Sequence, residues 1–179
     1  MLTKEKSDSK IIDEINIDTV MANALTAFEK YKKVSSGKRA AFLEEIAKQI
    51  SSITDDLINV ANAETNLPAP RLQGEINRTI FQLYFFADLL KKGSWIQAGI
   101  DTALPARKPL PKPDIRKMLV PVGPVIVFGA SNFPFAYSTA GGDTASALAT
   151  GCSVVVKAHS AHLKTSIMVS DAIKKSIEN

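Results

Sequence analysis

The chain has 179 residues, of which 45% are hydrophobic and 22% charged, an ordinary composition for a soluble globular protein with a buried core. Its net charge of +4 comes from basic residues scattered among acidic ones, which argues against a nucleic-acid partner. One cysteine, a polar N-terminus and the lack of any apolar stretch of membrane-spanning length predict a cytoplasmic protein without membrane association.

The first half of the chain is predicted to be helical. Residues 1–17 are polar and expected to be flexible, and apolar residues recur at helical spacing through 18–103. Asp18 is the candidate N-cap of the first helix, and Ser52 with Asp55 is typical of a capping box that starts a later one. Gly93 is expected to end the last helix of this region. The predicted buried positions are Leu43, Ile46, Ala47 and Ile50 in the second helix, and Ile76, Ile80, Leu83, Ala87 and Leu90 in the last.

Residues 104–117 form a proline-rich connector, which we expect to be extended because proline fits neither a helix interior nor a central strand. Beyond it, the pattern predicts a short β segment at 118–122, then strand, helix, strand and helix. The predicted bounds are 125–128, 135–149, 154–156 and 165–177, with Gly151 closing the first helix. The strand at 125–128 has no polar alternation, which predicts cover on both faces. A strand–helix–strand crossover makes a parallel pair, so 118–179 is predicted to be part of a dinucleotide-binding sheet.

Two loops follow the predicted parallel strands, at 129–134 and 157–162. Ligands of open parallel sheets bind beyond the carboxyl ends of the strands, so these loops are expected to line one crevice. The amide of Asn132 could donate to a developing oxyanion, or it could hydrogen-bond its own turn. Lys157 could bind a ribose or a phosphate, or be a solvated surface lysine.

Three further residues invite a chemical role that the pattern does not favour. His159 and His162 have no carboxylate or thiol neighbours in sequence, so we predict no metal site and two solvated loop histidines. Cys152 precedes the second strand, at the opposite end of the pair from Asn132, and no histidine base can be placed beside it. It is therefore predicted to be a buried core thiol rather than a nucleophile.

With these residues in view, the chain resembles the aldehyde dehydrogenase superfamily over nearly its whole length. The resemblance rests on residues 64–68, 71–75, 121–125, 132–134 and 147–157, among them Asn-Phe-Pro at 132–134 and Val-Val-Val-Lys at 154–157. Within the superfamily, residues 128–134, 141–148 and 157–159 most resemble 2,5-dioxovalerate (α-ketoglutaric semialdehyde) dehydrogenases and their NADP-linked fatty-aldehyde relatives. The resemblance implies an α/β fold in which N-terminal helices precede the first, incomplete part of a Rossmann-like parallel sheet.

The resemblance also implies roles for the candidate residues. Asn132 would be the oxyanion-hole asparagine, and Ala130, Ser131, Lys157, His159 and Ser160 would be the cofactor-binding residues. Many NAD-preferring members carry a glutamate where this chain has Ser160, so NADP is expected over NAD, because a serine does not repel a 2′-phosphate. The substrate would be a small aldehyde and the complete enzyme a homo-oligomer.

In the family, the nucleophilic cysteine and the glutamate base lie downstream of the position of Lys157, in a part of the enzyme that this chain lacks. We therefore expect an N-terminal fragment of an aldehyde dehydrogenase that is inactive alone. The alternative is a non-catalytic nucleotide-binding or interaction module that pairs with a full-length homologue through an open sheet edge.

Overall fold

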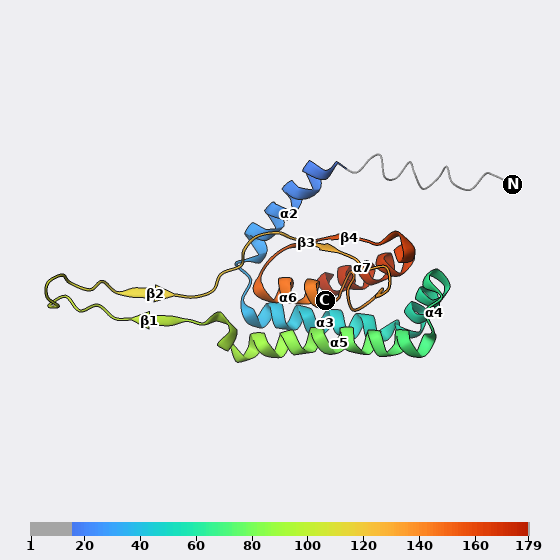
Figure 1. Cartoon of the computed structure of the whole chain (residues 1–179), viewed down its shortest axis with the longest axis horizontal. Coiled ribbons are helices and arrows are strands. Elements are labelled where there is room, and N and C mark those ends of the chain that lie inside the picture. Colours follow the sequence, from blue (N-terminus) through green and yellow to red (C-terminus); the bar gives the residue numbers. More distant parts are fainter. Residues whose placement is uncertain (1–15, 179) are drawn as a thin grey trace.

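The computed structural model describes residues 16–178, and four helices fill the first half of this part of the chain (Figure 1). They are α2 (Ile17–Tyr31), α3 (Ser36–Ser52), α4 (Thr54–Thr65) and α5 (Ala69–Lys92). α2 begins after Asn16, whose side-chain oxygen accepts a hydrogen bond from the backbone N–H of Thr19. Asp18 was the wrong choice of N-cap, because it already lies in the first turn of α2, where its negative charge still favours the helix dipole.

The junction of α3 and α4 at Ile53 is not a capping box. The hydroxyl of Ser52 donates to the carbonyl of Gln49 in its own helix, and no side chain caps α4. The predicted pairing of Ser52 with Asp55 is therefore wrong, because Ser52 remains inside α3. Gly93 does end α5, in the left-handed conformation (φ 73°) that glycine adopts without strain.

The helices share one apolar core, in which α3 and α5 lie side by side (Figure 1). The predicted faces are confirmed, except that Ile80 is only partly buried. The side chains at the centre of this core are 0–1% exposed: Leu43, Ile46, Ile50, Leu57, Leu72, Ile76 and Leu83.

A short 3-10 helix, η1 (Ser94–Ile96), leads into an arm that projects from the helices in Figure 1. The arm is an antiparallel pair of β1 (Gly99–Asp101) and β2 (Ile115–Lys117), with Gly99 opposite Lys117. The β segment predicted at 118–122 is wrong. Because β1 begins opposite Lys117, residues 118–122 have no pairing strand within the described part of the chain. There, the N–H of Leu119 donates to the carbonyl of Ile96.

The predicted parallel pair is confirmed: β3 (Val125–Phe128) and β4 (Val154–Lys157) pair with Val125 opposite Val154 and Phe128 opposite Lys157. The crossover helix α6 spans Gly142–Thr150, so the helix predicted from residue 135 begins later. Residues 131–141 form turns instead, because the chain there bonds to α5 and to itself. The glycine pair 141–142, which falls in the middle of the predicted helix, marks the start of α6 instead.

Cover on both faces of β3 was also the wrong expectation for this chain. Val127 is 3% exposed, whereas Ile126 and Phe128 on the other face are 47% and 71% exposed. Successive strand residues point to opposite faces, and the crossover helix covers only the face of Val127.

The chain closes with η2 (Ser160–His162) and α7 (Leu163–Glu178), which packs on α3 and α4. Among residues 16–178, no helix combines the length and the apolar character needed to cross a membrane.

Candidate functional site

The loops that follow β3 and β4 lie together, as the parallel pairing predicts. The N–H of Gly129 donates to the carbonyl of Lys157 at 3.0 Å. One residue further, the carbonyl of Ala130 lies 2.8 Å from Nε2 of His162. A Cβ at position 129 would stand 3.2 Å from the backbone nitrogen of His159, so a larger residue would fit only if the two loops moved apart slightly. Asn132 and Lys157 therefore belong to the same edge of the sheet.

Asn132 lies in a turn whose shape does not depend on its own side chain. The turn folds back through the N–H of Ala130, which donates to the carbonyl of Tyr137 at 2.9 Å. Asn132 is exposed, and its side-chain amide makes no hydrogen bond to any described residue. Its backbone carbonyl accepts from Nη2 of Arg71 at 2.6 Å. The alternative in which the amide ties its own turn is thus not observed, and the amide is available to a ligand.

One face of α5 holds the turn at three points. Arg71 donates to the carbonyl of Asn132, Glu75 accepts from the backbone N–H groups of residues 135 and 136, and Nη2 of Arg78 donates to Oη of Tyr137 at 3.1 Å. The guanidinium groups of Arg71 and Arg78 also lie over the rings of Phe133 and Tyr137, at 5.0 and 5.5 Å from the ring centroids.

These contacts were not predicted, although the sequence contains one signal for them. Residues 71, 75 and 78 are charged at a spacing that places them on one face of a helix. Glu75 in addition interrupts the apolar stripe of α5, between Leu72 and Ile76. A charge at such a position indicates a buried polar partner.

Lys157, the last residue of β4, is exposed at the same edge. Within residues 16–178 no carboxylate pairs with its ammonium group. Ser160 begins η2 and is also exposed. A free cation and a hydroxyl beside the small residues Gly129 and Ala130 suit an anionic ligand that must come close to the backbone.

The two histidines of the second loop behave differently from each other. His159 is half-buried, and its Nδ1 accepts from the N–H of Ala161 at 3.1 Å. His162 is 0% exposed, so the prediction that it is solvated is wrong. Its Nε2 bonds the carbonyl of Ala130, and its Nδ1 lies 3.3 Å from the hydroxyl of Ser166. A neutral ring with hydrogen on Nε2 satisfies both contacts, so His162 serves as a structural link between the two loops.

Cys152 is confirmed as a core thiol, with 2% exposure. The hydroxyl of Thr150 approaches its sulfur at 3.6 Å. Because β4 begins at Val154 and the turn with Asn132 follows the end of β3, the thiol and the amide lie at opposite ends of the parallel pair.

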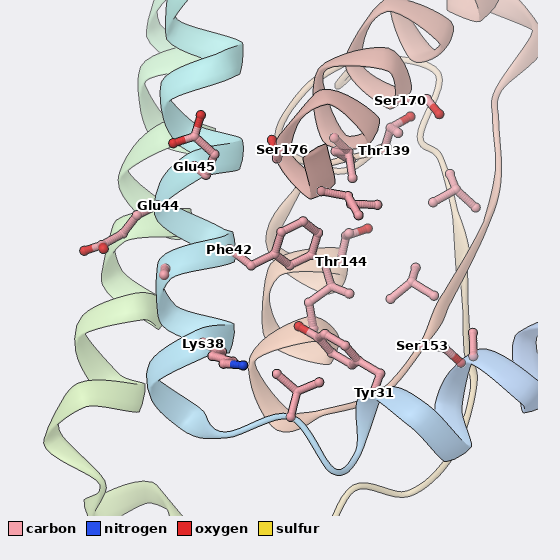
Figure 2. Close-up of a pocket in the computed structure, with 18 of the residues that line it drawn as sticks. Tyr31, Lys38, Phe42, Glu44, Glu45, Thr139, Thr144, Ser153, Ser170 and Ser176 are labelled. Carbon is pink, nitrogen blue, oxygen red and sulfur yellow. The ribbon is translucent and has the colours of Figure 1, made fainter. Parts of the chain in front are cut away.

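A large groove lies elsewhere, between α2, α3, α6, α7 and β4, with a volume of about 1390 Å³. Tyr31 and Phe42 point into this space in Figure 2, and none of the predicted site residues lines it. Burial raises the pKa of Tyr31 to about 12, although the nearby Arg39 acts in the opposite direction. The hydroxyls of Tyr31, Thr139 and Thr144 are buried there without a partner among the described residues.

Helices followed by a parallel strand–helix–strand unit, with polar groups at the carboxyl edge, define an α/β protein with a Rossmann-like sheet. The model of the aldehyde dehydrogenase family matches residues 6–177, and the chain belongs to this family. Proteins of the family are oxidoreductases that act on aldehydes with NAD(P).

Two curated relatives are similar to the chain in sequence. The alpha-ketoglutaric semialdehyde dehydrogenase of Acinetobacter baylyi is 54% identical over 168 residues, which are 94% of this chain and 32% of that protein. Alpha-ketoglutaric semialdehyde dehydrogenase 2 of Azospirillum brasilense is 52% identical over 164 residues, 92% of this chain and 31% of that protein. The chain thus spans about a third of the length of these relatives.

Solved structures show the same fold. A 3,6-anhydro-L-galactose dehydrogenase, solved in complex with NAP, superposes with a TM-score of 0.77 at 24% identity, over 89% of this chain and 31% of that one. A salicylaldehyde dehydrogenase from Pseudomonas putida, complexed with salicylaldehyde, gives a TM-score of 0.76 at 20% identity, again over 89% and 31% of the two chains.

Proposed function

We propose that this chain provides the oxyanion donor and a cofactor contact of an NADP-dependent enzyme that oxidises 2,5-dioxopentanoate (α-ketoglutaric semialdehyde) to 2-oxoglutarate. The observation that carries the proposal is the free amide of Asn132 on the same sheet edge as the free ammonium of Lys157. The names of the two relatives that are 54% and 52% identical support this choice of substrate.

Asn132 acts on the charge that develops when a thiolate adds to the aldehyde carbonyl. An amide donor in a fixed position stabilises the negative carbonyl oxygen of the transition state more than the carbonyl oxygen of the substrate. In other enzymes this effect is worth about 3–4 kcal/mol. Hydrogen bonds to Arg71 and Glu75 fix the backbone of residues 132–137, so the amide of Asn132 does not have to move during the reaction.

Lys157 and Ser160 would hold the adenosine end of the cofactor, with Ala130, Ser131 and His159 beside them. When bound, NADP supplies the acceptor for the hydride that leaves the substrate carbon. Lys157 provides a positive charge and Ser160 a donor, and neither repels a 2′-phosphate. Replacing Ser160 by Glu places a carboxylate at this point and is expected to weaken NADP binding at least tenfold while NAD binding is kept. Equal NADP affinity in both forms, measured by fluorescence titration of the chain, would contradict the assignment.

The thiolate does not come from this chain, because Cys152 is its only cysteine and lies buried away from Asn132. We therefore expect the isolated chain to show no aldehyde oxidation. The test places this chain in the Acinetobacter baylyi enzyme, in exchange for the 168-residue segment that it matches. The chimera is expected to oxidise the semialdehyde. Turnover by the isolated chain would contradict the proposed division of roles.

In this chimera, Asn132→Ala is expected to lower kcat by about 10²- to 10³-fold. Asn59→Ala is the matched control, because Asn59 is an exposed asparagine on α4. An Asn132→Ala chimera with unchanged kcat would exclude the oxyanion role.

A homo-oligomer remains part of the proposal and is supported by the arm of β1 and β2. Several of its apolar side chains are more than half exposed: Ile100, Leu104, Leu110, Met118 and Val120. Exposed apolar side chains on a projecting arm are available for contact with a second copy of the chain. We place the enzyme in the cytoplasm, because the single cysteine of this chain is a free buried thiol. Light scattering of the chimera tests the oligomer, and a concentration-independent monomer would contradict it.

A second candidate function is that of a non-catalytic module that pairs with a full-length homologue. The groove of Figure 2, which β4 helps to line, favours it. Within the described chain β4 pairs only with β3, so its other edge is open. Co-purification of the chain with the intact Acinetobacter baylyi enzyme, without any change in that enzyme's turnover, would favour this candidate over the first.

A further inference from the structure

Glu75 is a charged residue in the core of the helical region. Its side chain is 6% exposed, and its neighbours on the same stripe of α5, Leu72 and Ile76, are fully buried. An apolar residue would fill such a position at lower cost, because a buried carboxylate loses its hydration.

Only one of the two carboxylate oxygens of Glu75 has hydrogen-bond partners among residues 16–178. Oε1 accepts two hydrogen bonds, from the backbone N–H of Phe135 at 2.7 Å and from that of Ala136 at 2.9 Å. Oε2 is buried and has no partner within residues 16–178. A half-satisfied buried charge is a poor stabiliser of a fold, so the stability of the core alone does not account for Glu75.

The two N–H groups belong to the segment that carries Asn132. Pro134 has no N–H, so Phe135 and Ala136 provide the first consecutive pair of backbone donors after Asn132. Convergence of both on one oxygen fixes the direction in which the chain leaves the turn. Arg71 holds the turn at the carbonyl of Asn132 itself.

The surroundings allow this segment little freedom to shift. Phe135 and Ala136 are 2% and 1% exposed. The carbonyl of Ala136 also accepts the N–H of Gly142, at the start of α6. The carboxylate thus joins α5, the turn and the crossover helix at one point.

We propose that Glu75 is a positioning residue, which sets the orientation of the Asn132 amide by binding the N–H groups of Phe135 and Ala136. The inference rests on the proposed function, in which Asn132 donates to the oxyanion. It adds a residue that touches neither substrate nor cofactor and acts only through the backbone of the turn.

The experiment uses the complete 179-residue chain, labelled with nitrogen-15, and measures hydrogen exchange of the backbone amides and the spectrum of the Asn132 side-chain amide. In Glu75→Leu, the exchange of Phe135 and Ala136 is expected to rise at least a hundredfold, and the Asn132 amide signals to shift and broaden. Glu75→Gln keeps an acceptor oxygen but not the charge, so it is expected to restore most of the protection, with exchange about tenfold faster than in the parent chain.

Glu64 provides the matched control, because its carboxylate also binds two backbone N–H groups, those of Lys164 and Thr165. Glu64→Leu is expected to expose these two amides and to leave Phe135, Ala136 and the Asn132 signals unchanged. If Glu64→Leu loosens the turn as much as Glu75→Leu, the effect is a general loss of stability and the proposal is wrong. If Glu75→Leu does not fold, the amide exchange of Phe135 is compared between Glu75→Gln and Glu64→Gln instead. Equal exchange rates in these two variants overturn the proposal.

No turnover enters this measurement, so its outcome is independent of the oxyanion role. Asn132→Ala in the same chain is expected to leave the protection of Phe135 and Ala136 intact. Unchanged kcat in the Asn132→Ala chimera would contradict the proposed function. Unchanged exchange of the Phe135 and Ala136 amides in Glu75→Leu would contradict only the positioning role.

Discussion

The carboxylate of Glu64, near the end of α4, accepts hydrogen bonds from both the backbone N–H and the hydroxyl of Thr165, at 2.9 and 2.8 Å. Its other oxygen accepts the N–H of Lys164 at 2.8 Å. These donors lie in the first turn of α7, where N–H groups have no partner within the helix. A negative charge there also favours the helix dipole. A residue from a distant helix therefore supplies the cap of α7.

Removal of this cap is expected to destabilise the chain. Glu64→Ala should lower the free energy of unfolding by about 2 kcal/mol, because it leaves two backbone donors without a partner. Urea denaturation followed by circular dichroism measures the change. Glu29→Ala is the control, since the ion-pair partner of Glu29 among residues 16–178 is the nearby Lys32 on the surface, and we expect a change below about 0.5 kcal/mol. Equal losses in both variants would show that the bonds of Glu64 contribute no more than a surface ion pair.

Gly141 is required by the space around it rather than by its backbone angles. A Cβ at this position would stand 2.3 Å from the carbonyl oxygen of Ala136, although φ is an ordinary −69°. The obstacle is backbone, so Gly141→Ala is expected to displace the turn and to cost about 2–3 kcal/mol. Gly74→Ala, in the exposed interior of α5 with nothing within 4 Å, is expected to stabilise the chain by about 0.5–1 kcal/mol. The thermal unfolding midpoints of the two variants, each compared with that of the parent chain, test the expected loss and the expected gain of stability.

The buried ring of His162 predicts a difference between two substitutions. His162→Leu leaves the carbonyl of Ala130 without its donor and should lower the free energy of unfolding by about 2 kcal/mol. His162→Gln retains an N–H donor of similar reach, so a smaller loss is expected. His159→Gln, at the half-buried neighbour, controls for the loss of an imidazole. If the Leu and Gln variants lose equal stability, the hydrogen bond from His162 to the carbonyl of Ala130 makes no measurable contribution to the free energy of unfolding.

Tyr31 predicts how stability changes at alkaline pH. Burial raises its pKa from 10.0 to about 12 in the folded chain, so the unfolded chain loses this proton first as the pH rises. The stabilisation is fully present below pH 10 and is lost between about pH 10 and 12, by about 2–3 kcal/mol at 1.36 kcal/mol per pKa unit. Tyr31→Phe should lack this component, whereas Tyr84→Phe, at an exposed tyrosine, should keep it. Urea midpoints at pH 9 to 12 provide the measurement, and parallel curves for the parent chain and Tyr31→Phe would contradict the shift.

Much of the architecture follows from local patterns in the sequence. Apolar spacing located the faces of α3 and α5, Gly93 and Gly151 marked helix ends, and two apolar runs separated by a crossover predicted the parallel pair. These features depend on residues a few positions apart, because helix and strand periods are local properties. The same pairing rule brought the loops after β3 and β4 to one edge, and the position of Cys152 before β4 predicted its burial.

Contacts between distant residues decided the rest. α6 begins at Gly142 because the residues before it bond to Glu75, which lies sixty positions earlier. His162 is buried because the carbonyl of Ala130 is its partner, and Ile126 is exposed because the crossover helix covers one face of the sheet. The sequence by itself determined the family, the helical faces and the edge at which Asn132 and Lys157 lie. Only the tertiary structure decided how the Asn132 turn is held, because a buried hydrogen bond depends on which groups the fold brings together.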